Sequence, residues 1–290
     1  MPTVYLNGDF LPFENAKLSV LDRGFVFGDG VYEVWRVVNG QLFEHERHDR
    51  RLRRGIHALE LNVAERDVDG LADVASRLLR DNGLQQGEAT FYVEITRGSA
   101  FPRTHQYPPT GTRPTVLGMV NRFEVPHALR ASGAKAITEP DLRWLHCDIK
   151  TVQLLPNVMA KQKAHAAGAY EAIFVRDGTV TEGTHTSVLG VRNGELVTHP
   201  LSPLILPSVT REVVLEVARE QGVPVRERAF SERDMFDLDE LFVAGTTSDV
   251  TAIVDVDGKR IGSGSPGPVA RALYAGLQQR LYAESAVAQR

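Results

Sequence analysis

Five two-residue turn signals divide this chain into short segments, and they constrain its fold more than any other feature. Three are Asn-Gly pairs, at Asn7-Gly8, Asn39-Gly40 and Asn193-Gly194, and two are Asp-Gly pairs, at Asp177-Gly178 and Asp257-Gly258. Each pair lies between short apolar or alternating runs. These residues tolerate the positive φ angles of a type I′ turn, so each pair predicts a β-hairpin. Much of the chain is therefore expected to be antiparallel sheet.

Helical periodicity appears between the hairpins. The apolar spacing predicts helices over residues 45–59, 65–82, 157–167, 208–221 and 266–285, and several of these end at a glycine, as helix C-termini often do. Strands and helices do not alternate as regular βαβ units. The pattern therefore predicts an α+β fold rather than a doubly wound parallel sheet.

The length of 290 residues suggests about two domains. A proline-rich loop at 101–114 precedes the segment 119–125, where we place the boundary. The sequence thus predicts a small α/β N-terminal domain, residues 1–119, and a larger C-terminal domain, residues 120–290.

Composition excludes several classes of protein. The net charge of −4 offers no electrostatic reason to bind nucleic acid or an anionic membrane. The single cysteine, Cys147, excludes an internal disulfide and a multi-cysteine metal site. No leader-like segment and no apolar run of membrane-spanning length is seen, so we expect a cytoplasmic protein without a membrane partner.

Two motifs are better explained without a ligand. Gly262–Gly267 spells G-x-G-x-x-G, but it follows a predicted hairpin near the chain end, where no βαβ unit can follow. His45 and His48 lie among five arginines, which disfavour a bound dication. We interpret these histidines as part of a solvated helix face and predict no metal site.

Lysines are scarce, with only six among 33 basic residues. Five have plain surface explanations, whereas Lys150 lies between Arg143–Ile149, which resembles a mixed strand, and the apolar run that begins at Thr151. Partial burial favours a neutral, nucleophilic amine. Lys150 is therefore the candidate for amine chemistry.

Three later segments supply the other parts of a phosphate-bearing cofactor site. Glu182 begins a loop of small polar residues, Ser208–Thr210 form the first turn of a predicted helix, and Val243–Ser248 ends a strand in clustered hydroxyls. The amide groups of a helix N-terminus bind anions. A lysine amine, a carboxylate and an anion site are what pyridoxal phosphate requires.

These motifs, in this order, resemble the fold type IV pyridoxal-phosphate enzymes, and most closely the D-amino-acid aminotransferases among them. The similarity runs from Tyr5–Gly8 through Asp22–Glu33 to Asp257-Gly258. It implies a pseudo-barrel-like C-terminal domain, with the cofactor in the cleft between the domains. It also implies transamination of D-amino acids with 2-oxoglutarate or pyruvate, by a ping-pong route through a lysine Schiff base.

The resemblance assigns roles to residues on the cofactor side. Lys150 would be the catalytic Schiff-base lysine and Glu182 the partner of the pyridine nitrogen. Leu206 would pack on the ring. The phosphate would be held by Arg51, Val209, Thr210 and Thr246.

The substrate side is similar to the carboxylate trap of the D-amino-acid enzymes. There, a P-R-x-H-Q-F/Y-P segment and a tyrosine hold the carboxylate, and the corresponding residues here are Arg103, His105 and Tyr32. A guanidinium binds a carboxylate in bidentate fashion. In that family the partner subunit contributes the loop, so the resemblance implies a homodimer with shared active sites.

Four alternatives remain open on the sequence. Two are transaminases of the same class: an L-branched-chain aminotransferase and an amine transaminase. An aminodeoxychorismate lyase and a catalytically silent binding protein are the others. The Pro102–Pro108 segment argues against the first two.

Overall fold

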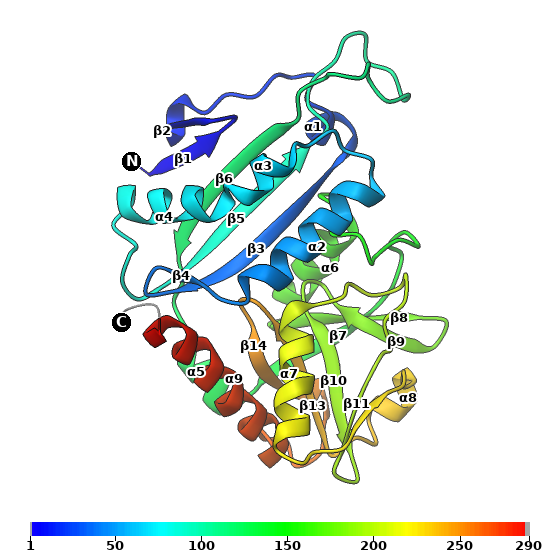
Figure 1. The fold of residues 1–290 in the computed structure, drawn as a ribbon. Coiled ribbons are helices and arrows are strands. Elements are labelled where there is room, and N and C mark those ends of the chain that lie inside the picture. The colour runs from blue at the N-terminus through cyan, green and yellow to red at the C-terminus, as the bar shows by residue number, and fades with distance from the viewer. Residues whose placement is uncertain (1, 288–290) are drawn as a thin grey trace. The chain divides into compact units, whose positions relative to one another are not determined.

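The computed structural model describes residues 2–287, with side chains described as far as residue 283. The chain divides into two compact units. Of the described residues, the first comprises those up to Glu124, Ile149–Gln153 and those from Tyr282 onward, and the second comprises Val125–Asp148 and Leu154–Leu281. Each unit combines a sheet with helices, which confirms the α+β prediction (Figure 1). The domain bounds 1–119 and 120–290 and the cofactor cleft stay predictions.

The first unit is built on an antiparallel sheet with the strand order β2-β1-β6-β5-β3-β4. Its longest pairing joins β3 and β5, from Gly30 opposite Thr96 to Val38 opposite Glu88. The strands are β1 (Thr3–Leu6), β2 (Asp9–Pro12), β3 (Gly30–Val38), β4 (Gln41–Leu42), β5 (Glu88–Thr96) and β6 (Thr115–Arg122). The sequence analysis places a domain boundary in the segment 119–125. Residues 119–122 of this segment form the end of β6.

Helices cover one face of this sheet (Figure 1). They are α2 (His45–Ala58), α3 (Glu65–Asp69) and α4 (Leu71–Asp81); the short η1 (Phe13–Asn15) and α1 (Arg23–Phe27) lie in the connection before β3. α4 buries Leu71, Ala75, Leu78 and Leu79, which share one helix face. They pack in one core with Trp35, Phe91 and Leu52.

The single helix predicted over 65–82 is wrong, because the structure has two. α3 ends at Asp69 and α4 begins at Leu71, with Gly70 between them. Glycine has a low helix propensity, so an apolar period that continues across it does not ensure a continuous helix.

The second unit holds a mixed sheet with the order β12-β11-β10-β13-β14-β7-β8-β9, and β15 pairs with β14. The pairings β11–β12, β14–β7 and β7–β8 are parallel, and the others are antiparallel. The strands are β7 (Ala134–Pro140), β8 (Glu171–Arg176), β9 (Thr179–Gly183), β10 (Ser187–Arg192), β11 (Glu195–Thr198), β12 (Val225–Glu227), β13 (Glu240–Gly245), β14 (Asp249–Val256) and β15 (Lys259–Arg260).

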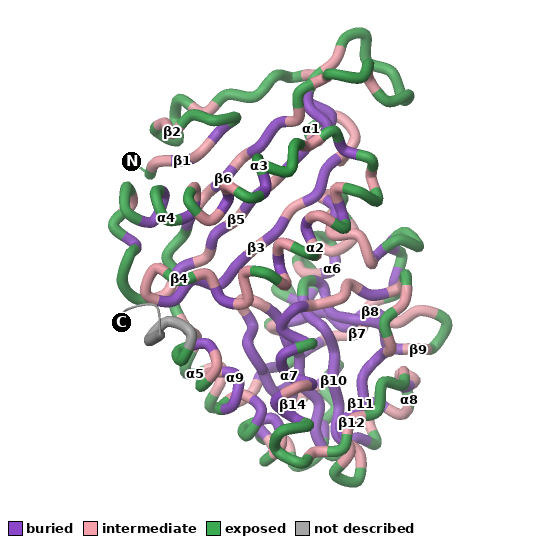
Figure 2. Tube along the Cα trace, in the orientation of Figure 1, coloured by how far each residue is buried: buried purple, intermediate pink, exposed green. Residues whose placement is uncertain are grey.

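Strands β10, β13 and β14 are buried along most of their length (Figure 2). Such continuous burial means that both faces of the sheet are covered there. One cover is α7 (Val209–Glu220), which packs on β13. The other helices that belong wholly or mainly to this unit are α5 (His127–Ser132), α6 (Leu155–Ala166), α8 (Glu232–Met235) and α9 (Pro268–Val287).

All five predicted hairpin turns are confirmed. Each pair has positive φ at both residues, for example 54° at Asn7 and 105° at Gly8. The turns join β1 to β2, β3 to β4, β8 to β9, β10 to β11 and β14 to β15. Within the described part of the chain, no helix combines the length and the apolar character needed to cross a membrane.

Candidate functional site

Lys150 is fixed by its backbone to the edge of β3. The Tyr32 amide donates to the Lys150 carbonyl at 3.0 Å, and the Val152 amide donates to the Gly30 carbonyl at 3.1 Å. This is the edge that β4 leaves uncovered, since β4 pairs only with Val37 and Val38. The flanking segment Arg143–Ile149 is irregular rather than the strand expected from its sequence.

The Lys150 side chain lies over the ring of Tyr32, which in turn packs near Tyr92. Its Nζ atom is 4.1 Å from the centre of the Tyr32 ring. The Tyr32 ring is 5.7 Å from that of Tyr92, whose hydroxyl donates to Glu94 at 2.6 Å. Burial, together with Glu94, raises the pKa of the Tyr92 phenol, so this hydroxyl stays a donor. Sequence reasoning missed Tyr92 and Glu94, which both lie on β5 and point to the same face of it.

Arg51 is held by a fully buried carboxylate, that of Glu33 on β3. Arg51 Nε donates to Oε2 at 2.8 Å, Arg51 Nη2 donates to Oε1 at 2.6 Å, and His48 Nδ1 is 3.0 Å from Oε1. Burial opposes ionisation of Glu33, but Arg51 and His48 outweigh it and hold the pKa of that carboxyl well below its usual range.

The solvated face predicted for His48 is therefore wrong. His48 is buried, and burial lowers the pKa of its imidazole despite the neighbouring Glu33. The five surrounding arginines suggested a solvent-facing helix, but one side of α2 turns toward Glu33. No group of His, Cys, Asp or Glu within the described residues has an arrangement that could hold a metal.

Arg103 and His105 lie together on the exposed loop after β5. The Arg103 guanidinium is 4.3 Å from the centre of the Phe27 ring, and the His105 ring is 5.4 Å from the same centre. Among the side chains described, neither residue contacts Tyr32 or Lys150 within the chain. Two of the three predicted carboxylate-binding residues are thus brought together, and Tyr32 lies instead beside Lys150.

Glu182 lies at the end of β9 in the second unit and is buried. Its Oε2 accepts the Leu206 amide at 3.0 Å, and its Oε1 pairs with Arg143. Arg143 is shared, because its Nε and Nη2 donate to the Asp141 carboxylate at 2.9 and 2.8 Å. Burial raises the pKa of Glu182, and Arg143 with the Leu206 amide offsets only part of that effect.

Arg143 was missed at the sequence level, because a single arginine in an apparent strand carries no signal of its own. In the structure it joins the carboxylates of Asp141 and Glu182 and donates to the Leu204 carbonyl at 3.2 Å. It thereby fixes the loop that ends at Leu206.

The predicted anion site is the start of α7, a helix of 12 residues. Ser208 caps it, its side chain accepting the Arg211 amide at 3.2 Å. Val209 and Thr210 form the first turn and are buried, while Leu206 and Thr246 are half-buried. Amides at such a start are available to an anion. Val209, Thr210 and Leu206 therefore lie on one continuous segment that also contacts Glu182.

Comparison with known proteins identifies the family. The model of the family Amino-transferase class IV matches residues 30–256. The chain is 39% identical over 289 residues to a D-alanine aminotransferase from Bacillus licheniformis, covering 98% of each protein. It is 37% identical over 285 residues to a D-alanine aminotransferase from Staphylococcus haemolyticus, covering 98% of this chain and 100% of that protein.

A solved structure shows the same fold. The branched-chain aminotransferase of the archaeon Thermoproteus uzoniensis, solved with norvaline, superposes with a TM-score of 0.84 at 26% identity, over 97% of this chain and 95% of that one. The chain belongs to the class IV aminotransferase family. It is therefore an aminotransferase of the pyridoxal-phosphate-dependent type.

Proposed function

We propose that this chain transfers the amino group of D-amino acids to a 2-oxo acid, 2-oxoglutarate or pyruvate, with pyridoxal 5′-phosphate as cofactor. The observation that carries the D-amino-acid assignment is the loop on which Arg103 and His105 lie side by side on Phe27. Two cationic or donor side chains held together suit the α-carboxylate of an amino acid. The names of the relatives from Bacillus licheniformis and Staphylococcus haemolyticus support the same substrate class.

The residues present fit the cofactor. Glu182 is a buried carboxylate whose charge is only partly balanced by Arg143, which suits a protonated ring nitrogen as a second partner. The capped start of α7 offers Val209 and Thr210 to a phosphate. Pairing of Arg51 with Glu33 is compatible with a phosphate partner, because a guanidinium has five N–H donors. We assign Thr246 to the phosphate and Leu206 to the ring face.

When bound, pyridoxal phosphate supplies an electron sink for the bonds at the substrate α-carbon. The Lys150 Nζ atom would hold the cofactor between turnovers. Once the amino acid has displaced it, this amine would accept the proton from the substrate α-carbon and pass it to the cofactor. Tyr32 holds the Lys150 amine through its ring, 4.1 Å away. Glu182 would offer its buried carboxyl group to the ring nitrogen.

The two substrates use the same site in turn. The amino acid leaves as a 2-oxo acid before the second 2-oxo acid enters, so Arg103, His105 and Tyr32 bind a carboxylate in both half-reactions. We also propose a homodimer in which the Arg103 loop completes the partner's site, and a reducing, cytoplasmic setting, in keeping with one cysteine. Light scattering during gel filtration tests the dimer.

Activity on paired substrates tests the proposed function. With pyruvate or 2-oxoglutarate present, D-alanine and D-glutamate are expected to react and their L-enantiomers to be poor substrates. A preference for L-leucine would identify an L-branched-chain enzyme, and a preference for a chiral amine would identify an amine transaminase. Pyruvate release from aminodeoxychorismate without an acceptor would identify a lyase. Purified protein that gains no visible absorption with pyridoxal phosphate would overturn all four of these enzyme activities and favour a catalytically silent binding protein.

A further inference from the structure

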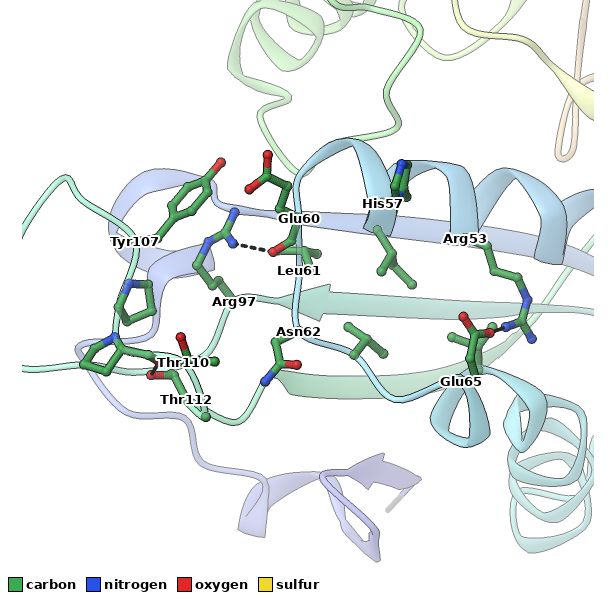
Figure 3. Close-up of a pocket in the computed structure, with 16 residues that line it drawn as sticks. Arg53, His57, Glu60, Leu61, Asn62, Glu65, Arg97, Tyr107, Thr110 and Thr112 are labelled. Atoms are coloured by element: carbon green, nitrogen blue, oxygen red, sulfur yellow. Dashed lines mark hydrogen bonds and ion pairs between the residues drawn. The ribbon is translucent and has the colours of Figure 1, made fainter.

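The loop that carries Arg103 and His105 lacks the support that usually fixes a binding residue. From residue 101 to residue 107 its side chains are exposed. Beneath its continuation, from Tyr107 to Thr112, lies a cavity of about 560 Å³ (Figure 3). The opposite wall is formed by the end of α2 and the segment that follows it. Apolar packing therefore does not hold this loop in place.

Arg23 holds the loop by its backbone. Its Nη1 atom donates to the carbonyls of Thr104 at 2.8 Å and Gln106 at 3.3 Å, and its Nη2 atom donates to the carbonyl of His105 at 3.4 Å. Only 6% of Arg23 is exposed. Three successive carbonyls around one planar guanidinium fix the local shape of the chain in a way that a single donor cannot.

Asp29 links this contact to a second arginine. It accepts Arg23 Nε at 2.8 Å and is bound by Arg97 Nε and Nη2 at 2.8 and 3.0 Å. Burial opposes ionisation of Asp29, but Arg97 and Arg23 outweigh it and lower the pKa of its carboxyl. Arg97 also donates to the Glu60 carbonyl and lies 3.6 Å from the centre of the Tyr107 ring, at the cavity wall (Figure 3). The far end of the loop is thus tied to the same carboxylate.

Phe27 lies next to Arg23 and next to the two side chains assigned to the substrate carboxylate. Its ring is 4.6 Å from the Arg23 guanidinium carbon, 4.3 Å from that of Arg103 and 5.4 Å from the His105 ring. Cations are attracted to an aromatic face. The residue that holds the loop backbone and the two residues that the loop presents therefore share one aromatic ring.

We propose that Arg23 is the positioning residue of the carboxylate-binding loop, acting with Asp29 and Phe27. This inference rests on the proposed function, since it assigns Arg103 and His105 to the substrate carboxylate. Arg23 touches no substrate. It sets the spacing of Arg103 and His105, and thereby selects substrates that carry an α-carboxylate.

Arg23→Lys tests this proposal in the cofactor-loaded enzyme, because lysine keeps the charge toward Asp29 but loses the planar fork. The carboxylate is bound equally before and during the reaction, so KM for D-alanine and for pyruvate is expected to rise about 10-fold or more while kcat falls less than about 3-fold. The matched control is Arg77→Lys. Arg77 also lies over an aromatic ring, 3.9 Å from the centre of Phe10, but contacts no part of the loop. Its kinetics are expected to match the wild type.

Limited proteolysis gives a readout that does not depend on activity. Arg103 is an exposed trypsin site within the loop. Cleavage after Arg103, followed by mass mapping of the fragments, is expected to be about 10-fold faster or more in Arg23→Lys and to keep the wild-type rate in Arg77→Lys. Unchanged cleavage would overturn the support role, and faster cleavage with unchanged KM would overturn the role in substrate binding. Wild-type protein inactive on every D-amino acid would overturn the proposed function instead, and the cleavage result would still decide whether Arg23 holds the loop.

Phe27→Leu covers the case in which Arg23→Lys does not fold. It removes the shared ring and leaves the three carbonyl bonds of Arg23 in place. KM for both substrates is expected to rise about 3-fold, a smaller change because the backbone stays fixed. A KM equal to that of the wild type, with Arg103 and His105 intact, would contradict the proposal.

Discussion

Glu33 in the first unit and Glu182 in the second are both buried glutamates bound to an arginine, yet their pKa values move in opposite directions. Glu33 has Arg51 and His48 as partners, and its pKa falls. Burial raises the pKa of Glu182, and Arg143, which Glu182 shares with Asp141, offsets only part of that effect. Burial opposes ionisation of both carboxyls, so the neighbouring groups decide the direction of each pKa shift. Arg51 and His48 outweigh burial at Glu33, whereas Arg143 and the Leu206 amide do not outweigh it at Glu182.

This difference matches the roles proposed for the two residues. Glu33 is satisfied within the protein and fixes Arg51, so it is expected to act in stability. Glu182 is incompletely balanced, so a cationic ring nitrogen would be a favourable further partner. A carboxylate that is fully paired in the cofactor-free protein would have less to gain from such a contact.

The largest expected effect follows from Glu33→Gln. Removing one partner of a buried ion pair leaves the other charge uncompensated, so the free energy of unfolding should fall by about 3–5 kcal/mol in urea unfolding. Glu65→Gln is the control, since Glu65 also pairs with an arginine, Arg53, but its side chain is 84% exposed. The control should lose less than about 1 kcal/mol. Equal losses would refute the contrast between buried and exposed pairs.

Glu182→Gln should act on turnover rather than on the fold. Loss of the charge opposite the ring nitrogen is expected to lower kcat for D-alanine about 100-fold, as loss of a preorganised electrostatic partner does elsewhere. Unfolding free energy should change little, because the ionised form is already disfavoured in the folded protein. Glu216→Gln removes a carboxylate that pairs with Arg280 at 2.6 Å, and it should leave kcat unchanged. A kcat of Glu182→Gln close to the wild type would remove Glu182 from the site.

The smallest expected effects are changes of about 1 kcal/mol in the free energy of unfolding as the pH is varied. Glu33 has a lowered pKa, so its stabilisation is present above about pH 4.3, the value for unfolded chains, and is lost as the pH falls below it. Glu182 has a raised pKa, so the stability from its protonated form is present below about pH 4.3 and is lost as the pH rises through the folded value. Urea unfolding of the cofactor-free protein at pH 7 and pH 4 gives the free energy of unfolding of the wild type and of each glutamine variant. The difference between wild type and Glu33→Gln is therefore expected to change with pH in the opposite direction to the difference between wild type and Glu182→Gln. Parallel trends would show that the two carboxylates do not differ.

Local features of this chain could be predicted from the sequence, whereas distant pairings could not. The turn at Asn39-Gly40 depends on two residues whose φ angles are set locally, and it forms as expected. The capped start of α7 at Ser208 is equally local. His48 is different, because its burial depends on Glu33, which lies on a strand 15 positions earlier.

The candidate site shows the same division. Lys150 could be chosen because lysines are few, and Glu182 because its motif resembles a known family. Arg143 and Arg23 could not, since each acts by bonds to residues far along the chain: Arg143 to Glu182, 39 positions away, and Arg23 to Thr104, 81 positions away. Only the folded structure shows which arginine donates hydrogen bonds to which loop.

The central claim is that Lys150, one of six lysines, carries the cofactor. Borohydride reduction of the pyridoxal-phosphate-loaded protein, followed by proteolysis and mass mapping, tests it directly. The expected result is a phosphopyridoxyl mass on the peptide that contains Lys150 and on no other lysine peptide, and its absence in Lys150→Ala together with loss of turnover. Stable labelling of a different lysine, or a Lys150→Ala variant that keeps both the label and the wild-type rate, would contradict the account.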